Sequence, residues 1–303
     1  MKAAVFHEFG GPEVLVTADV DIPEPGPGHV RVRVRAAGVQ AYDAAVRGGW
    51  TPPGASITFP QIVGNDFAGT VDALGDDVGE FSVGDEVLGW AILCCYAEYL
   101  VVPTSQVVKK PATMPWEVAG AFSASAQTAH TALEALGVRA GDTFLVHAAA
   151  GGVGSVAVQL AKLRGAHVIG TASESNHAFL RDLGAVPIVY GDGLTSRVRA
   201  AAPQGVSVAL DAVGGAALDT SVELIEDRKR IATLVDFGRV DELGVRAVFS
   251  QRDKSRLAEL AEIYARGELR IEVSRTFPLD QAHEAHRLIE TGHARGKTVI
   301  TVA

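Results

Sequence analysis

Residues 147–162 read HAAAGGVGSVAVQLAK. Three alanines lead into Gly-Gly-Val-Gly, and small and aliphatic residues follow, with no charge before the final lysine. The preceding segment, 142–148, is a short apolar run that is typical of a buried strand. The apolar residues after the glycines recur on one face of a helix expected over 153–164: Val153, Val156, Ala157, Leu160 and Leu163. The stretch therefore predicts a strand, a small-residue loop and a helix.

Three small residues of this loop, Ala149, Gly151 and Gly154, have the spacing of G-x-G-x-x-G, with alanine in the first place. In such a loop the first residue allows a tight turn, the second lets the main chain approach a pyrophosphate, and the third lets helix and strand pack closely. The helix N-terminus offers free N–H groups and a partial positive charge to the anion. Tight packing alone is the alternative reading. The α/β alternation that follows favours dinucleotide binding.

Strands alternate with helical patterns along the chain from Pro111–Pro115 onward. This alternation is the signature of a doubly wound parallel sheet, so we expect a Rossmann domain. We expect helices over 116–136, 153–164, 175–183, 194–201 and 215–225, strands over 143–147, 167–171, 186–189, 207–210 and 230–235, and a further helix from about 253.

The first 110 residues instead contain short β patterns separated by glycine, proline and aspartate turns. Residues 29–39 (HVRVRVRAAGV) alternate strictly, with valines on one face and arginines on the other. The last 30 residues return to a β-α-β pattern. We expect the terminal strand, 297–302, to rejoin the first domain.

Composition bounds the function classes. The chain has 303 residues, 48% of them hydrophobic, and a formal net charge of −9, which argues against a nucleic-acid groove or a basic membrane face. The N-terminus lacks the apolar core of a signal peptide, and no run of about 18 apolar residues is present. The two cysteines are adjacent, Cys94 and Cys95, and cannot build a disulfide framework. We expect a cytoplasmic protein with no nucleic-acid or membrane partner.

The end of the strand at 167–171 should select the dinucleotide. NAD binding usually places a carboxylate there for the ribose hydroxyls, and a carboxylate would repel the 2′-phosphate of NADP. The strand runs into Thr171, Ala172 and Ser173, without an acid at its tip. Ser173 and Asn176 can donate to a phosphate, and His177 could add charge. We expect NADPH, although an inward Glu174 would favour NAD.

Longer segments resemble the medium-chain dehydrogenase/reductase superfamily and, within it, the zinc-independent quinone oxidoreductases. They include MKAAVFHEFGGPEVL, PGPGHVRVRVRAAGV, FPQIVGNDFAGTVDALGDDVGEFSVGDEV, AQTAHTAL, AAAGGVGSVAVQLAK and ARGKTVITV. The resemblance implies a mostly β, GroES-like catalytic domain over 1–115 and 265–303, a Rossmann domain inserted over 116–264, and an active site in the cleft. It also implies a homodimer, for which the β-rich stretch 229–238 could supply a free sheet edge.

Metal ligands distinguish branches of this superfamily. Gln40 stands where zinc-dependent members have a cysteine, and Asn65–Asp66 replace their His-Glu. Zinc needs three or four ligands within tetrahedral reach, so we expect no metal. We read Cys94 and Cys95 as partly buried thiols, with a redox-sensing pair as the alternative. The HEAH stretch, 283–286, lacks the HExxH spacing and is expected on the solvated surface.

The absence of zinc ligands favours an acceptor that needs no Lewis acid. Hydride addition to a quinone or enone spreads the negative charge over an enolate, which a few hydrogen bonds can stabilise. Gln40 could hydrogen-bond a carbonyl, Tyr42 could donate a proton or simply pack in its loop, and Trp50 could stack on a flat ring. Asp43 is expected to hold the turn, and Asp66 to be a satisfied carboxylate.

The resemblance adds further cofactor contacts. Thr128 would lie near the nicotinamide or phosphates, Tyr190 near the adenosine phosphate, and Val213 under the nicotinamide ribose. The stretches around Phe237, Phe249 and Ser250 resemble loops that close over the ring, and Arg295 and Lys297 would face the cleft or solvent. With these, the predicted cofactor-binding residues are Thr128, Ala150, Gly151, Gly152, Val153, Gly154, Ser173, Asn176, His177, Tyr190, Val213, Phe237, Phe249, Ser250, Arg295 and Lys297.

These observations predict NADPH-dependent, zinc-independent reduction of quinones by hydride transfer from the nicotinamide. An enoyl or alkenal reductase, as used in polyketide metabolism, is the enzymatic alternative, because the same fold and hydride geometry serve both. A non-catalytic NADPH-binding sensor or structural protein is the alternative of another class.

Overall fold

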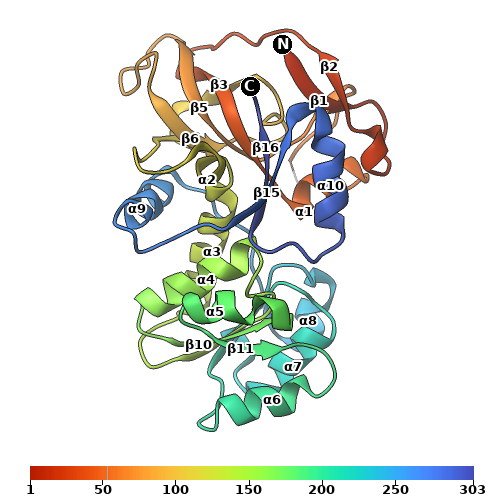
Figure 1. Cartoon of the computed structure of the whole chain (residues 1–303), viewed down its shortest axis with the longest axis vertical. Helices are drawn as coiled ribbons and strands as arrows, with labels where there is room; N and C mark the ends of the chain where they lie inside the picture. The colour runs from red at the N-terminus through yellow and green to blue at the C-terminus, as the bar shows by residue number, and fades with distance from the viewer. Residues whose placement is uncertain (53) are drawn as a thin grey trace. The chain divides into compact units, whose positions relative to one another are not determined.

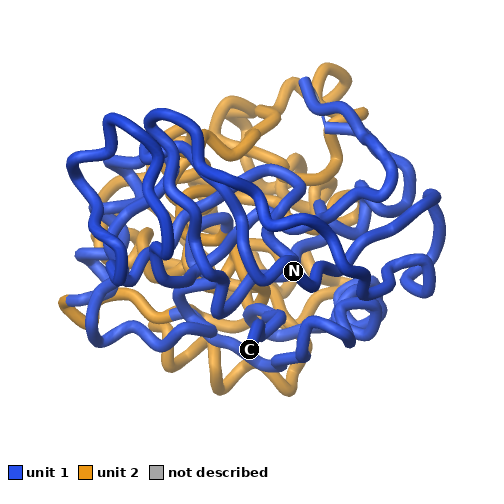
Figure 2. The backbone as a smooth tube through the Cα atoms, turned by 90° about the horizontal axis from the view of Figure 1, so that it is seen from above, with its two compact units in different colours: residues 1–124, 253–265, 271–303 blue, residues 125–252, 266–270 orange. Residues whose placement is uncertain are grey.

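The computed structural model describes residues 1–52 and 54–303, and the chain forms two compact units. Unit 1 contains Met1–Ala124, Asp253–Ala265 and Ile271–Ala303, and unit 2 contains Ser125–Arg252 and Arg266–Arg270 (Figure 2). Unit 1 therefore gathers both ends of the chain. In the described residues, no helix combines the length and the apolar character needed to span a membrane.

Unit 2 is built on a six-stranded sheet in the order β11-β10-β9-β12-β13-β14, and every pairing in it is parallel. This is the strand order 3-2-1-4-5-6 of a dinucleotide-binding sheet, so the predicted Rossmann fold is confirmed. The strands are β9 (Thr143–Val146), β10 (His167–Ala172), β11 (Val186–Val189), β12 (Val208–Asp211), β13 (Ile231–Thr233) and β14 (Arg246–Ala247).

Helices pack against this sheet because each has an apolar face. Helix α4 (Gly152–Leu163) contacts β9 and β10, and α7 (Ala216–Leu224) contacts β12 and β13. Figure 1 labels α4, α5, α6 and α7 of this unit together with its strands β10 and β11. The strand residues Leu145, Ile169 and Ile231 form a buried apolar cluster with Val198 of α6 (Leu194–Ala201) and Leu218 of α7. The helices assigned wholly or mainly to this unit are α3 (Phe122–Leu136), α4 (Gly152–Leu163), α5 (His177–Asp182), α6 (Leu194–Ala201), α7 (Ala216–Leu224) and α8 (Val240–Leu243), with short 3₁₀ turns at Glu174–Asn176, Arg228–Arg230 and Phe237–Arg239.

Two expectations about residues 116–238 are corrected. The helix expected over 116–136 is two helices, α2 (Trp116–Gly120) and α3, which are separated by Ala121. The stretch 229–238 does not offer a free sheet edge, because its strand β13 pairs with β12 on one side and with β14 on the other. The outermost strand on that side is β14.

Unit 1 is mostly β. Its larger sheet has the order β15-β16-β3-β5-β6-β8, with β7 also paired to β3, and a smaller sheet has the order β2-β1-β4. The strands are β1 (Lys2–Phe6), β2 (Val16–Asp19), β3 (His29–Val39), β4 (Gln61–Ile62), β5 (Asp66–Leu74), β6 (Glu86–Trp90), β7 (Tyr99–Pro103), β8 (Val107–Lys109), β15 (Val273–Pro278) and β16 (Lys297–Thr301). Its helices are α1 (Ala41–Arg47), α2, α9 (Lys254–Ala265) and α10 (Ala282–Glu290), with 3₁₀ turns at Pro12–Val14, Thr104–Gln106 and Leu279–Gln281.

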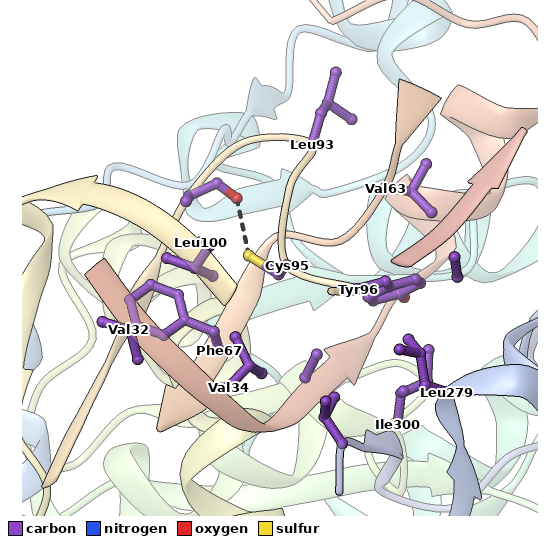
Figure 3. Packing of buried hydrophobic residues seen from close by; sticks show 14 of the residues in the cluster. Val32, Val34, Val63, Phe67, Leu93, Cys95, Tyr96, Leu100, Leu279 and Ile300 are labelled. Carbon is purple, nitrogen blue, oxygen red and sulfur yellow. Dashed lines mark hydrogen bonds between the residues drawn. The ribbon is translucent and has the colours of Figure 1, made fainter. Parts of the chain in front are cut away.

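Strand β3 organises unit 1. Its valines, Val30, Val32 and Val34, are buried, whereas the alternating arginines are partly or fully exposed, as the sequence predicts. The last strand, β16, pairs antiparallel with the end of β3, with Thr298 opposite Val39, so the C-terminus does rejoin the first domain. Figure 3 shows the apolar side chains of this core, including Phe67, Leu100 and Ile300, around Cys95 and Tyr96.

The expectation that residues 283–286 lie on the solvated surface is wrong for His286, which is fully buried. Its Nδ1 lies 3.3 Å from Nη1 of Arg47, and its ring meets the Tyr96 ring edge-on at 5.8 Å. Burial and the Arg47 charge lower the pKa of His286 to about 3. The neutral imidazole is therefore a core residue of unit 1.

Candidate functional site

The small-residue loop of unit 2 makes a tight turn between β9 and α4. Ala148 adopts a positive φ of 54°, and the Gly151 N–H donates to the Ala148 carbonyl over 2.9 Å. Gly151 is the N-cap of α4, and the first bond within the helix runs from the Ser155 N–H to the Gly151 carbonyl over 2.9 Å. The helix therefore begins immediately after the turn.

The third glycine is required by contact with this turn. A Cβ at position 154 would lie 2.3 Å from the Ala148 oxygen and 2.8 Å from Cα of Ala149, distances that the main chain cannot accept. A Cβ at Gly151 would lie 3.3 Å from the Ala148 oxygen, which is tight but tolerable after a small shift. Gly154 thus provides the close packing that the sequence predicts for it.

The start of α4 fits an anion. The N–H groups of Gly152, Val153 and Gly154 precede the first bond within the helix, so the helix supplies them with no acceptor. The 12-residue helix also concentrates partial positive charge at this end. Ala150 is buried at the loop, whereas Gly151, Gly152 and Val153 remain partly accessible. These residues could hold the diphosphate of a dinucleotide at the carboxyl edge of the sheet.

The end of β10 carries a small polar cluster. Nδ2 of Asn176 donates to Oγ of Ser173 over 3.0 Å, and Oγ of Ser175 lies 3.0 Å from the same atom. Nε2 of His177 is buried and has no hydrogen-bond partner among the described residues. Glu174 is exposed. The structure therefore brings Ser173 and Asn176 together where the sequence expects the adenosine ribose, and His177 follows as the first residue of α5.

Asp211 organises the loop after β12, a role that the sequence analysis does not assign to it. Its buried carboxylate accepts from the N–H groups of Val213 and Gly214 over 3.0 and 2.9 Å, and from the Thr233 hydroxyl over 2.7 Å. The Thr233 hydroxyl oxygen in turn accepts from the N–H of Asp236 over 3.0 Å. An acid at a strand end, three residues before the Gly214–Gly215 pair, is the signal that could reveal it. Asp211 fixes the loop that presents Val213, which is 58% exposed.

His147 is a second structural residue for which the sequence predicts no role. It is fully buried, with Nε2 2.9 Å from Oγ of Ser221 and Nδ1 3.3 Å from Oγ1 of Thr171. Burial lowers the pKa of His147 to about 4, although the charge of Asp211 acts to raise it. The neutral imidazole joins the ends of β9 and β10 to α7, directly before the small-residue loop.

The other residues of unit 2 that the sequence predicts to contact the cofactor lie on several different loops and helices. The rings of Phe237 and Phe249 stack at 4.6 Å with an interplanar angle of 18°, and both are substantially exposed. Ser250 follows as an exposed residue, Tyr190 is 51% exposed after β11, and Thr128 is partly buried in α3. The Phe237–Phe249 stack makes an exposed flat apolar surface.

In unit 1, Gln40 is the N-cap of α1. Its N–H donates to Oδ2 of Asp43 over 3.0 Å, and the Tyr96 hydroxyl donates to the same oxygen over 2.8 Å. Nε2 of Gln40 is buried and has no hydrogen-bond partner among the described residues. Asp43 holds the turn as predicted, and Gln40 keeps an amide donor for an additional acceptor.

Burial raises the pKa of Asp43 to about 7. The Tyr96 hydrogen bond and the charge of Lys297 oppose this rise, and the charge of Asp66 adds to it. Tyr96 is fully buried, and burial together with Asp43 raises the pKa of its phenol well above the usual value. No local pattern points to Tyr96, because it lies 53 residues from Asp43.

Tyr42 and Trp50 contact each other edge-on, with ring centroids 5.1 Å apart. Trp50 is 46% exposed, and its N–H donates to the Ala45 carbonyl over 2.9 Å. The turn that ends α1 therefore presents an accessible indole beside a partly buried phenol.

Lys297 does not lie on a solvated surface. It is 6% exposed, and its Nζ donates to the Val39 carbonyl over 3.2 Å. Arg295 is exposed and pairs with Glu272 over 3.1 Å. The two basic residues of the ARGKTV stretch thus differ, since one is internal to unit 1 and the other is at its surface.

The residues that stand at zinc-ligand positions have other contacts. Oδ2 of the buried Asp66 accepts from the Ala124 N–H over 2.8 Å, and the Asn65 carbonyl accepts from the Ala91 N–H over 3.2 Å. Cys94 is half-buried, and Cys95 is fully buried with its thiol donating to the Ala91 carbonyl over 3.3 Å (Figure 3). Within residues 1–52 and 54–303, no cluster of three or more His, Cys, Asp or Glu side chains is placed to hold a metal ion.

Similarity to known proteins shows which family the chain belongs to. The alcohol dehydrogenase GroES-like domain family matches residues 26–112, and the zinc-binding dehydrogenase family matches residues 183–300. The quinone oxidoreductase of Pseudomonas aeruginosa is 33% identical over an aligned length of 328, which covers 99% of this chain and 99% of the relative. The chain belongs to the quinone oxidoreductase family. The predicted GroES-like domain and membership of the medium-chain dehydrogenase/reductase superfamily are confirmed.

Two further relatives bear on the chemistry of this quinone oxidoreductase family member. A mycobacterial protein solved in complex with NADPH has a TM-score of 0.87 at 31% identity, covering 99% of this chain and 100% of that chain. A Streptomyces orinoci protein of the spectinabilin polyketide synthase system is 33% identical over 265 residues. That match covers 80% of this chain but only 12% of the much longer relative.

The first prediction separates the two glycines of the loop. We expect Gly154→Ala to lower the free energy of unfolding by about 1–3 kcal/mol, because its methyl group would collide with the main chain at Ala148. Gly151→Ala should leave stability within about 1 kcal/mol and weaken NADPH binding instead, because its methyl group would occupy the approach to the helix N-terminus. Urea unfolding and calorimetric titration with NADPH measure the two effects.

The exposed Gly79 has no heavy atom within 4 Å of an added Cβ, so Gly79→Ala is the matched control and should change neither quantity. Equal stability losses for Gly151→Ala and Gly154→Ala would contradict the assigned roles.

The second prediction concerns Asp43. Its pKa in the folded chain, about 7, is above the ordinary 3.8, so the native state binds the proton more tightly than the unfolded state does. Its contribution to stability is full below pH 3.8 and is lost as pH rises through 7. The stability of the wild type minus that of Asp43→Asn should therefore fall by up to about 3 kcal/mol between pH 5 and pH 8.

Urea unfolding of both proteins at four pH values measures this difference. The buried histidines are present in both proteins, so their titration cancels. A difference that stays constant with pH would show that the Asp43 pKa is not raised.

Proposed function

We propose that the chain reduces quinones with NADPH by hydride transfer, without zinc. The observation that carries this proposal is the α4 N-terminus, which the side-chain-free Gly154 packs against the turn after β9, in a chain that belongs to the quinone oxidoreductase family. When bound, NADPH supplies a hydride from its nicotinamide ring. The mycobacterial relative solved with NADPH supports the choice of cofactor.

The residues of unit 2 bind and orient the cofactor. The N–H groups of Gly152, Val153 and Gly154 donate to the diphosphate, with Ala150 and Gly151 forming the wall of the turn. Ser173, Asn176 and His177 donate to the 2′-phosphate, and Tyr190 lies beside the adenosine.

The nicotinamide end of the cofactor binds at other loops of unit 2. Asp211 stabilises the Val213 loop, and the residues that surround the nicotinamide are Thr128, Phe237, Phe249 and Ser250. Arg295 is proposed to contact the cofactor from the surface.

The residues of unit 1 act on the acceptor. Gln40 donates from its unpartnered Nε2 to a carbonyl oxygen that gains negative charge as hydride adds to the conjugated system. Tyr42 supplies a proton to that oxygen, and the accessible indole of Trp50 stacks on the flat ring. The amide donor acts where the charge develops, which is the role a Lewis acid would otherwise have.

Zinc independence is supported by the donors at the ligand positions. Gln40 is a neutral amide there, and Asp66 already accepts from the start of α3. Neutral amides are weak ligands for Zn²⁺, which prefers thiolate, imidazole and carboxylate.

Enoyl reduction is the second function that an observation favours. The match to a segment of the Streptomyces orinoci polyketide synthase system protein supports it. Hydride addition to an enoyl carbonyl compound also produces an enolate, so Gln40 would have the same task.

We further propose a homodimer in the cytoplasm. The outermost strand β14 is short and offers an edge that a second copy could extend. The adjacent unbridged cysteines suit a reducing compartment. Gel filtration with light scattering at micromolar concentration should give twice the chain mass, and a monomer would contradict the dimer.

The third prediction is the substrate and metal test. Oxidation of NADPH should be fastest with 1,4-benzoquinone, slower with 2-hexenal and slowest with crotonyl coenzyme A, because quinones are the most readily reduced acceptors. Prior dialysis against EDTA should leave the rate within about two-fold, since no residue acts through zinc. Absorbance at 340 nm follows each reaction.

A preference for the enoyl thioester would favour the second function. Tight NADPH binding without turnover of any acceptor would favour a sensor, and loss of activity that zinc restores would contradict the metal-free chemistry.

The fourth prediction tests cofactor choice. Ser173→Asp should lower kcat/KM for NADPH about ten-fold or more, because the new carboxylate repels the 2′-phosphate. The same variant should gain relative activity with NADH. Ser175→Asn, a neutral change in the same cluster, is the control. A wild type that prefers NADH would show that the end of β10 does not select NADPH.

A further inference from the structure

A single peptide unit in unit 1 is hydrogen-bonded at both ends by buried ionisable side chains. Between Val39 and Gln40, the carbonyl accepts from Nζ of Lys297 over 3.2 Å, and the N–H donates to Oδ2 of Asp43 over 3.0 Å. Lys297 is 6% exposed and Asp43 is fully buried. Because the peptide is planar, hydrogen bonds at its oxygen and at its nitrogen together restrict the orientation of the whole unit.

Separate segments of the chain support the two charged groups. Lys297 begins β16, and the pairing of Thr298 with Val39 places the lysine beside the end of β3. Asp43 belongs to α1, and its Oδ2 is also bound by the hydroxyl of the fully buried Tyr96. The peptide is therefore held from the C-terminal strand, from α1 and from the segment before β7.

The arrangement has an energetic cost that stability alone does not explain. Taking an ammonium and a carboxylate out of water is expensive, and neutral groups could satisfy one carbonyl and one N–H. Hydrogen bonds to ionised groups are stronger than bonds between neutral groups, and they restrict the orientation of what they bind. The peptide so restricted leads directly into Gln40, whose Nε2 has no partner among the described residues.

We propose that Lys297 and Asp43 form a clamp on the Val39–Gln40 peptide that aims the Gln40 amide at the acceptor carbonyl. Both are positioning residues, and Tyr96 holds Asp43 in place. The inference rests on the proposed role of Gln40 in quinone reduction. It replaces the predicted cofactor contact of Lys297 with a task inside unit 1.

The fifth prediction tests the clamp with a double-mutant cycle on Lys297→Met and Gln40→Ala. Methionine keeps the apolar stem of Lys297 but cannot donate. Lys297→Met should lower kcat/KM for 1,4-benzoquinone about ten-fold or more, with the KM for NADPH unchanged. In the Gln40→Ala background the same change should cost less than about two-fold, because there is no amide left to aim.

Lys110→Met is the matched control. Lys110 is also a buried lysine of unit 1, with Nζ donating to the carbonyls of Pro111 and Met114 over 3.2 and 2.9 Å, and it does not bind the clamped peptide. Its loss should change thermal stability without changing the quinone kinetics. Tyr96→Phe serves as a milder second variant if Lys297→Met does not fold, and its smaller effect should also vanish in the Gln40→Ala background.

The outcomes are distinct. Equal losses in the wild-type and Gln40→Ala backgrounds would overturn the clamp and leave the proposed function intact. A Gln40→Ala variant with unchanged quinone kinetics would overturn the role of Gln40 and, with it, the clamp. A wild type without NADPH-dependent quinone reduction would overturn the proposed function itself.

Discussion

The contact between α4 and the turn after β9 is possible only because position 154 has no side chain. Any Cβ there would lie 2.3 Å from the Ala148 oxygen, so the helix would have to withdraw from the sheet edge. The contact keeps the first N–H groups of the helix at the carboxyl end of the parallel strands. At that edge His147, Asp211 and the Ser173 cluster also collect, since each follows or ends a strand. One absent methyl group thus sets the geometry on which the proposed cofactor site depends.

Unit 1 differs from unit 2 in that several polar side chains are buried inside its apolar β core. Asp43, Tyr96, Lys297 and His286 are all buried, and each has a hydrogen bond to another segment of the chain. The pKa shifts follow from the same burial, upward for the Asp43 carboxyl and downward for the His286 imidazole. Next to these hydrogen bonds, Nε2 of Gln40 has no hydrogen-bond partner among the described residues. Unit 1 therefore holds this hydrogen-bond donor next to a peptide unit that is hydrogen-bonded to the buried Lys297 and Asp43.

The sequence predicts the elements better than it predicts the site. The β3, β11 and α6 ranges match their expected ranges to the residue, because alternation and helical spacing are local signals. Gly154 is also readable, since the pattern names its role. Lys297 is not, because its partner Val39 is 258 residues away and only the β16–β3 pairing brings them together. The surface position predicted for His286 is wrong for the same reason, because its contacts also come from distant parts of the sequence. Its neighbours in sequence are polar, whereas Arg47 and Tyr96 pack against it in the fold.

A crystal structure of the protein with NADPH would show where the cofactor's diphosphate binds. We expect diphosphate oxygens within about 2.7–3.2 Å of the Gly152 and Val153 nitrogens, at the start of α4. We also expect the 2′-phosphate beside Ser173 and Asn176. A diphosphate bound away from the α4 N-terminus, with these N–H groups left to solvent, would contradict the proposed cofactor site.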